Sequence, residues 1–297
     1  MRIATFITAL TIAAAVARAT VAAEQAARPS NPFFALCIST HDPKSRAPAD
    51  QAKLLKQLGY AGTAHVWLDG VHEAIKAADD NGLELYQIYV RVSLVANKPA
   101  YDARLKDVVK SLKGRQTMLG LLIQGKPPSA VEHDPQAVKI VREIAAMAVE
   151  SGVRIALYPH TGDWLARAED AVRVADKVDR KNVGVMFNLC HWMRTDKQEN
   201  LVPVLRKVAP RLFAVSINGA DRDNTAELAR WIQPLGRGTY DVYPVVKTLT
   251  ELGYTGPVGL QCYGVKGDVR ENLQGSIDTW RKFCERIAAE QPEVPAR

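Results

Sequence analysis

Short apolar runs along the chain alternate with stretches whose apolar residues recur every three or four positions. The first pattern is typical of buried strands and the second of amphipathic helices. Between 135 and 150, for example, Val138, Val141, Ala145 and Ala148 fall on one helical face. The short runs predict eight strands, at 34–39, 62–67, 83–92, 118–124, 153–160, 183–190, 212–218 and 258–263.

A helical stretch follows every predicted strand. These stretches lie at 52–59, 71–81, 101–112, 135–150, 164–178, 201–208, 242–252 and 269–287. Eight pairs of strand and helix in about 270 residues match the count and size of a single (β/α)8 TIM barrel, an α/β fold. An open doubly wound sheet is disfavoured, because no Gly-x-Gly-x-x-Gly follows the first strand and the sequence contains no phosphate-binding loop.

The first residues have the layout of a secretory signal peptide. A basic start precedes an apolar run at 3–16, and small residues up to Ala23 and a polar segment follow. The run is shorter than the roughly 20 apolar residues that a membrane-spanning helix needs. We expect residues 1–23 to be removed after Ala23, or alternatively after Ala19. The barrel domain at 24–297 is then periplasmic or secreted, without a membrane partner.

The composition is that of an ordinary folded protein, with 47% hydrophobic and 24% charged residues. The net charge of +7 falls by two, to +5, when the two arginines of segment 1–23 are removed. This mild basic excess does not call for a nucleic-acid partner. Export permits disulfides, but the four cysteines lie far apart in the sequence. A Cys37–Cys262 bridge between the first and last strands stays open, and small buried thiols are the favoured interpretation.

In a (β/α)8 barrel the active site lies at the carboxyl ends of the strands and in the loops that follow them. Polar and aromatic side chains gather at these ends of the predicted strands. They are Asp42, His65, Trp67, Asp69, Tyr89, Arg91, Gln124, Tyr158, His160, Asn188, His191, Trp192, Asn218, Asp221, Gln261 and Tyr263. Packing or helix capping explains each of them equally well when it is taken alone, so their common position is the signal.

Three segments in the second half of the chain are more specific. They read Asn188-Leu-Cys-His191, Gly236-Arg-Gly-Thr-Tyr-Asp241 and Leu252-Gly-Tyr-Thr-Gly256. With these segments the chain resembles the xylose isomerase-like TIM barrels, the sugar phosphate isomerase/epimerase family, over nearly its whole mature length. The resemblance implies a (β/α)8 barrel and an isomerase or epimerase activity on sugars.

Members of that family usually hold a divalent cation with Glu, Asp, His and Glu at the ends of the last four strands. Carried over by motif, these positions are Tyr158, Asn188, Asn218 and Gln261. A phenol and three neutral amides lack the charge with which carboxylates bind hard cations. All four ligand positions are therefore substituted, and we predict no cofactor at them.

The family moves a proton next to a sugar carbonyl with glutamates, and this chain has neither of them. We expect His160, His191 and Asp221 to be catalytic instead, together with Arg237, which can polarise an oxygen or bind an anionic group. A zinc-type site of His65, His160 and His191 is an alternative if the three side chains converge. Their spacing follows no local metal-binding motif.

The strand ends also suit a carbohydrate ligand, because aromatic faces stack on sugar rings and amides bind hydroxyl groups. The residues that we expect to bind it are His65, Trp67, Tyr89, Gln124, Tyr158, Asn188, Trp192, Asn218, Gln261 and Tyr263.

We therefore predict an exported isomerase, epimerase or lyase that acts on a sugar or an oxidised sugar derivative. Outside the cytoplasm, a phosphorylated substrate is disfavoured. The alternative is a non-catalytic carbohydrate-binding barrel, in which the loss of the metal ligands indicates that catalytic activity has been lost. An endonuclease is disfavoured, because that activity relies on metals bound by several His and acidic residues. The sequence leaves the substrate and the oligomeric state open.

Overall fold

The computed structural model describes residues 29–38, 42, 44, 46–223 and 227–290, and the predicted signal peptide at 1–23 lies outside them. Two units are distinguished in the chain. One comprises residues 31–279, and the described residues 29–30 and 280–290 belong to the other. Among the described residues, no helix combines the length and the apolar content needed to cross a membrane.

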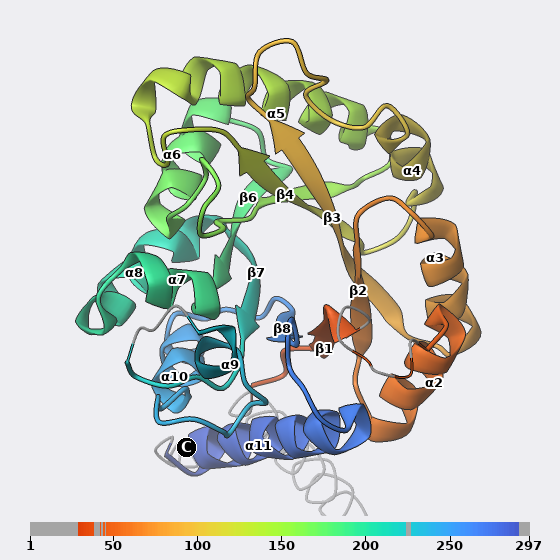
Figure 1. Cartoon of the computed structure of the whole chain (residues 1–297), viewed down its shortest axis with the longest axis vertical. Coiled ribbons are helices and arrows are strands. Elements are labelled where there is room, and N and C mark those ends of the chain that lie inside the picture. Colours follow the sequence, from red (N-terminus) through yellow and green to blue (C-terminus); the bar gives the residue numbers. More distant parts are fainter. Residues whose placement is uncertain (1–28, 39–41, 43, 45, 224–226, 291–297) are drawn as a thin grey trace, which may run out of the picture. The chain divides into compact units, whose positions relative to one another are not determined.

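Eight parallel strands close into a barrel in chain order, with β8 hydrogen-bonded to β1 (Figure 1). The strands are β1 (Phe33–Leu36), β2 (Gly62–Val66), β3 (Glu84–Ser93), β4 (Met118–Gln124), β5 (Arg154–Leu157), β6 (Val183–Asn188), β7 (Leu212–Ile217) and β8 (Val258–Gln261). The predicted (β/α)8 fold is confirmed.

Helices follow the strands, and within residues 31–279 they surround the barrel (Figure 1). They are α2 (Pro48–Leu58), α3 (Val71–Asp80), α4 (Leu105–Ser111), α5 (Asp134–Val149), α6 (Ala168–Val178), α7 (Leu189–Thr195), α8 (Leu201–Val208), α9 (Leu228–Trp231), α10 (Tyr243–Glu251) and α11 (Val269–Glu290). The short helices α7 and α9 are additions to the sequence prediction. Both lie at the carboxyl ends of the strands, where a site would form.

The inside of the barrel is packed with side chains that alternate along the strands. Phe34, Tyr86, Tyr89, Met118 and Met186 belong to this buried core. Gly120 of β4 makes room for one of them, because a Cβ at that position would lie 2.7 Å from the ring of Tyr89. The interior is therefore a filled core, and open space begins only above it.

Strand β6 ends two residues before the predicted boundary, and Asn188 is the reason. Its side-chain oxygen accepts the backbone N–H of His191 at 3.5 Å and so caps the N-terminus of α7. The Asn-x-x-His spacing is thus that of an N-cap residue and the third residue of its helix. The cap places His191 in the first turn of a helix that begins directly at the barrel mouth.

Candidate active site

A cavity of about 510 Å³ opens at the carboxyl ends of the strands, a size that suits a small-molecule ligand. Side chains from β2, β3, β4 and β8 line it, together with residues from the segments that follow β1, β2, β5, β6, β7 and β8. Its polar and aromatic lining is Trp67, Tyr89, Arg91, Gln124, Tyr158, His160, Thr161, Asp163, His191, Arg194, Trp231, Gln261 and Tyr263. Most of the residues expected at the strand ends therefore meet in one cavity.

Tyr158 and Gln261 line this cavity, and these two residues, together with Asn188, which is hydrogen-bonded to Tyr158, are called the floor below. Tyr158 follows β5, Asn188 ends β6 and Gln261 ends β8, and all three side chains are buried. The phenol oxygen of Tyr158 accepts the Nδ2–H of Asn188 at 2.6 Å and the Nε2–H of Gln261 at 3.5 Å. Three of the four positions at which the family resemblance implies metal ligands are thus joined by hydrogen bonds.

The orientation of both floor amides is fixed by groups that can only donate. The Oδ1 of Asn188 accepts the backbone N–H of His191, and the Oε1 of Gln261 accepts that of Tyr263 at 3.0 Å. The NH₂ groups must therefore face Tyr158. The phenol oxygen receives two N–H donors, and its own proton has no acceptor among the described residues.

The floor does not fit the divalent cation that the family resemblance implies. Hard cations bind oxygen ligands, whereas the amides of Asn188 and Gln261 present N–H groups to the centre. Burial also raises the pKa of Tyr158 well above its usual range, so the phenol keeps its proton. The fourth ligand position, Asn218, lies outside the cavity lining, and its Nδ2 donates to the carbonyl of Trp231 at 2.9 Å.

Two histidines stand together on the wall of the cavity, with the ring centroids of His160 and His191 4.1 Å apart. The Nδ1 of His191 accepts the backbone N–H of Thr161 at 3.3 Å, which leaves the proton of the neutral ring on Nε2. The Nδ1 of His160 lies 3.5 Å from the carboxylate of Asp163. Burial lowers the pKa of both rings, and Asp163 partly opposes the shift at His160. Both rings are therefore neutral at pH 7.

Asp163 is a site residue that the sequence did not reveal. Burial raises the pKa of its carboxyl, while His160 and the amide of Gln124 act in the opposite direction. Within the part of the chain that the structure describes, it is the only acidic side chain that lines the cavity. Its position three residues after His160, in a loop that follows a strand, is a signal by which it could have been found.

Two arginines stacked on tryptophans form what we call the rim of the cavity. The guanidinium carbon of Arg91 lies 3.8 Å from the ring centroid of Trp67. That of Arg194 lies 5.5 Å from the ring centroid of Trp231. Arg194 and Trp231 belong to α7 and α9, the two short helices that the sequence pattern did not predict.

Two residues expected to be catalytic lie outside the cavity lining. Asp221 accepts the Nε–H of Arg230 at 3.2 Å and the backbone N–H of Thr239 at 3.0 Å, so it organises the loop before α10. Arg237 is exposed on that loop. The neighbouring Gly238, with φ of +87°, packs so closely on Ala220 that a Cβ would lie 2.1 Å from its carbonyl oxygen. The glycine-rich segment therefore serves to pack this loop closely against Ala220.

Two residues expected to bind substrate also point elsewhere. Trp192 packs on Phe187, with ring centroids 5.9 Å apart, on the outer face of β6. The Nε2 of His65 lies 2.6 Å from the carbonyl oxygen of Asp69, away from the histidine pair. The structure thus does not bring His65, His160 and His191 together. Among the described residues, no group of three His, Cys, Asp or Glu side chains is placed to hold a metal ion.

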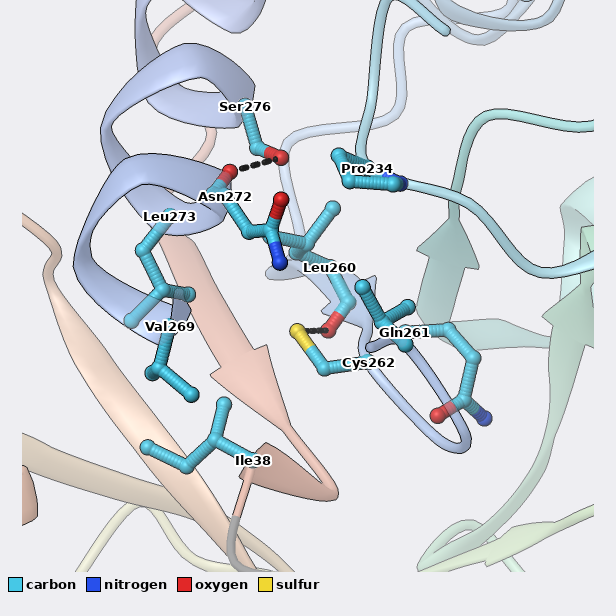
Figure 2. Close-up of a pocket in the computed structure, with 10 residues that line it drawn as sticks. Ile38, Pro234, Leu260, Gln261, Cys262, Val269, Asn272, Leu273 and Ser276 are labelled. Atoms are coloured by element: carbon cyan, nitrogen blue, oxygen red, sulfur yellow. Dashed lines mark hydrogen bonds between the residues drawn. The ribbon is translucent and has the colours of Figure 1, made fainter. Parts of the chain in front are cut away.

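A second, smaller hollow of about 20 Å³ lies between β1, β8 and the start of α11 (Figure 2). Leu260, Val269 and Leu273 line it, and Gln261 is turned away from them in Figure 2. Its size and apolar lining exclude a sugar. Cys262, at the same place, is a free thiol, as are the other three cysteines, so the Cys37–Cys262 bridge is not formed.

The comparisons with known proteins agree with this architecture. Solved structures with a similar fold include the IOLI protein with a binding zinc atom, at 16% identity and a TM-score of 0.67 over 86% of this chain and 99% of that one. A D-allulose 3-epimerase from Methylomonas sp. has 14% identity and a TM-score of 0.67 over 86% and 99%. The D-psicose 3-epimerase with D-tagatose from Clostridium cellulolyticum H10 has 18% identity and a TM-score of 0.62 over 86% and 95%. No curated protein matches the chain.

These identities establish a shared fold alone. The sequence profile of the xylose isomerase-like TIM barrels, in contrast, matches residues 52–283, which is most of the chain. This protein belongs to the xylose isomerase-like TIM barrel family.

Proposed function

We propose that this barrel is a carbohydrate-active isomerase, epimerase or lyase that moves a proton next to a sugar carbonyl without a metal ion. The proposal rests mainly on the hydroxyl of Tyr158. Its oxygen accepts hydrogen bonds from two fixed amides, and its own proton has no acceptor among the described residues. The family, which includes sugar epimerases, and the epimerase crystallised with D-tagatose support a carbohydrate ligand. The predicted signal peptide extends the proposal to an exported enzyme.

In this proposal Tyr158 performs the electrophilic role. Its O–H donates to the carbonyl oxygen of the sugar, where negative charge develops when the neighbouring C–H bond breaks. The amide N–H groups of Asn188 and Gln261 favour this, because they stabilise negative charge on the phenol oxygen. A buried donor already aimed at that oxygen needs no rearrangement during the reaction.

His160 acts as the general base. With the Nδ1 proton turned towards Asp163, its Nε2 lone pair accepts the proton from the carbon next to the carbonyl. The C–H electron pair becomes the C=C bond of an enediol, and the carbonyl π electrons move to the oxygen held by Tyr158. In an isomerase, His160 gives its proton to the former carbonyl carbon, and the proton of the neighbouring hydroxyl passes to Tyr158. In an epimerase, water protonates the original carbon from its other face, and His160 gives its proton to solvent. In a lyase, a β-substituent leaves with the electron pair of its bond and takes up the proton of His160.

His191 binds and orients the substrate in the same step. Its Nε2 carries the proton of the neutral ring, because Nδ1 accepts the backbone N–H of Thr161. The ring therefore presents a donor to a sugar hydroxyl beside the base. The two histidines thus have different tasks, which their different neighbours assign, Asp163 for His160 and Thr161 for His191.

Deuterium exchange tests the proposal directly. The purified protein is incubated in D₂O with ketohexoses and 3-keto glucosides, with and without EDTA, and C–H exchange is followed by NMR. We expect exchange next to the carbonyl in both conditions, and none in the His160→Gln variant. Sugar binding by calorimetry without exchange on any of these compounds would instead support a non-catalytic carbohydrate-binding barrel.

A further inference from the structure

A hollow of about 390 Å³, called the side hollow below, adjoins the cavity at the end of β3. Strand β2 ends at Val66, which pairs with Tyr89, whereas β3 continues to Ser93 and pairs there with β4. Among the described strands, none pairs with residues 90–93 on the β2 side. The side hollow lies against this uncovered part of β3.

Three residues line both the side hollow and the cavity. They are Trp67, Tyr89 and Arg91, so the two spaces meet at these side chains. Trp67 has a left-handed backbone conformation, with φ of +69°, which a bulky residue rarely adopts. Its backbone N–H donates to the carbonyl of Tyr89 at 3.2 Å, and the guanidinium of Arg91 packs on its ring. Strained residues of this kind cluster at ligand sites, which supports a functional role for the junction at Trp67.

Charged side chains hold the two loops of the side hollow together. Arg104 donates to Asp69, which follows β2, at 2.7 Å, and to Asp102, which follows β3, at 3.0 Å. The Nε2–H of His65 donates to the carbonyl of Asp69 at 2.6 Å and fixes the first loop. His65, which we expected to bind substrate, therefore positions a loop of the side hollow.

The charges that line the side hollow are balanced. Asp69 and Asp102 supply two carboxylates, and Arg91 and Arg104 supply two guanidinium groups. A lining without net charge favours an uncharged ligand. Acceptors and donors side by side suit hydroxyl groups, because a hydroxyl both donates and accepts.

Aromatic rings give the same hollow apolar surface. Trp67 and Tyr101 line it, and the hydroxyl of Tyr101 donates to the carboxylate of Glu143 in α5, which holds the ring in place. A sugar ring has an apolar face of C–H groups and an edge of hydroxyl groups. Aromatic surface beside charged hydrogen-bonding groups is thus the combination that such a ring needs.

Another hollow, of about 450 Å³, also adjoins the cavity and shares Gln124 and Asp163 with it. Tryptophan, tyrosine and phenylalanine are absent from its described lining, so it offers a sugar no comparable ring surface. Val95 lines this hollow and Ala100 lines the side hollow, although both belong to the segment that joins β3 to α4.

We propose that the side hollow binds a second sugar unit, and that the ligand of this protein is therefore a glycoside of at least two units that crosses Trp67. The first unit, in the cavity, rests on the function proposed above. The second unit packs on Tyr101 and forms hydrogen bonds with Asp69 and Asp102. Such a glycoside fills both spaces, whereas a single sugar leaves the side hollow to water.

Equilibrium binding tests the proposal without requiring turnover. Calorimetry compares the neutral disaccharides maltose, cellobiose, laminaribiose, gentiobiose and lactose with the methyl glycosides of their non-reducing units. Ala100→Trp fills the side hollow, and Arg104→Met removes the link between its loops without adding bulk. Val95→Trp is the matched control, because it adds the same side chain to the same segment but in the other hollow. Circular dichroism checks that each variant is folded.

We expect at least one disaccharide to bind about tenfold or more tightly than its methyl glycoside, because the second unit adds ring contacts and hydrogen bonds. Ala100→Trp and Arg104→Met should each remove most of that difference, and Val95→Trp should keep it. Binding of the methyl glycoside should stay within a factor of about two in all three variants, since the cavity is unchanged. No preference for any disaccharide, a preference that survives both Ala100→Trp and Arg104→Met, or one that only Val95→Trp removes overturns the proposal.

The outcome is separable from that of the proposed function. A preference for a disaccharide, with no C–H exchange on any sugar, supports the second sugar unit and contradicts the proposed chemistry. Exchange on single sugars, with equal affinity for disaccharides and methyl glycosides, contradicts the second sugar unit and supports the chemistry.

Discussion

The floor and the rim of the cavity differ in burial, charge and rigidity. The floor, formed by Tyr158, Asn188 and Gln261, is buried and uncharged, and donors from the backbone fix both of its amides. The rim carries the charges of Arg91 and Arg194 on the faces of two tryptophans. A fixed, dry donor suits charge that develops during a reaction, whereas a charge near water suits recognition of a charged ligand.

In the function proposed above, a family barrel exchanges its chemistry and keeps its fold. Three positions at which the family resemblance implies metal ligands meet at the oxygen of Tyr158, which accepts hydrogen bonds from the amides of Asn188 and Gln261. Substitutions in the floor should therefore change the catalytic rate. Substitutions in the rim should change which ligand binds.

The largest expected effect is that of Tyr158→Phe. Removal of the donor should lower kcat by about a hundredfold to a thousandfold, the usual loss for one oxyanion donor, with little change in KM. The matched control is Tyr89→Phe, because the two rings are neighbours at 5.1 Å but the hydroxyl of Tyr89 donates to Gln87. Steady-state kinetics measures kcat for both variants. An equal loss of kcat in Tyr158→Phe and Tyr89→Phe would contradict a specific role for the Tyr158 hydroxyl.

A pH profile of activity tests the role of His160, which lies on the wall of the cavity. The pKa of His160 is lowered, mainly by burial, so the base is neutral and active down to a pH below its ordinary value of 6.5, and kcat/KM should fall only below that pH. Asp163 raises this pKa and Arg91 lowers it. Asp163→Asn should therefore move the acid limb to lower pH, and Arg91→Met should move it to higher pH. Shifts in the same direction for both variants would contradict this arrangement.

Ionic strength should act on the rim and spare the floor. Raising NaCl from about 0.05 to 0.5 M should weaken binding of an anionic sugar such as methyl β-D-glucuronide several-fold, because salt screens exposed charges. Binding of the uncharged amide of this sugar, and kcat at saturating substrate, should stay within a factor of about two, since buried groups are screened little. Calorimetry and rate measurements in the same buffers compare the two. If salt lowered kcat as strongly as it lowered the binding affinity, exposed charges would contribute to the catalytic step. That result would contradict the division between floor and rim.

The smallest effect on activity is expected at the apolar hollow beside α11. Ser276 accepts the backbone N–H of Leu235 at 3.0 Å and donates to the carbonyl of Asn272 at 2.7 Å. Ser276→Ala leaves that buried N–H unpaired, which should cost about 1–3 kcal/mol of unfolding free energy in a urea titration. The kcat of the folded protein should not change, and a loss of activity in proportion to Tyr158→Phe would show that the two regions are coupled.

The strand ends were predictable from the sequence because hydrophobic periodicity locates them and the fold brings them together. This reasoning placed Tyr158, His160, His191 and Gln261 at strand ends, and all four line the cavity. The same reasoning placed Trp192 in the cavity, but helix α7 starts at Leu189, and one residue turns the chain by about 100°. His191 therefore faces the cavity, while Trp192 packs on Phe187.

Loops and short helices were harder to predict, because contacts distant in sequence determine them. The side chain of Asn218 holds the carbonyl of Trp231, thirteen residues away, and Trp231 supplies part of the rim. Asp221 is likewise tied to Thr239 rather than directed into the cavity. A local sequence pattern does not reveal these partners, so Arg194 and Trp231 were recognised as cavity residues only in the structure.

The central claim, that Tyr158 takes over the task of a metal ion, has one direct test. C–H exchange in D₂O is measured for the wild type and Tyr158→Phe after dialysis against EDTA, and again after addition of Zn²⁺ or Mg²⁺. The account predicts exchange by the wild type that neither EDTA nor added metal changes, and exchange by Tyr158→Phe that is about a hundredfold to a thousandfold slower in every condition. Loss of exchange in EDTA and its recovery with either metal would contradict it.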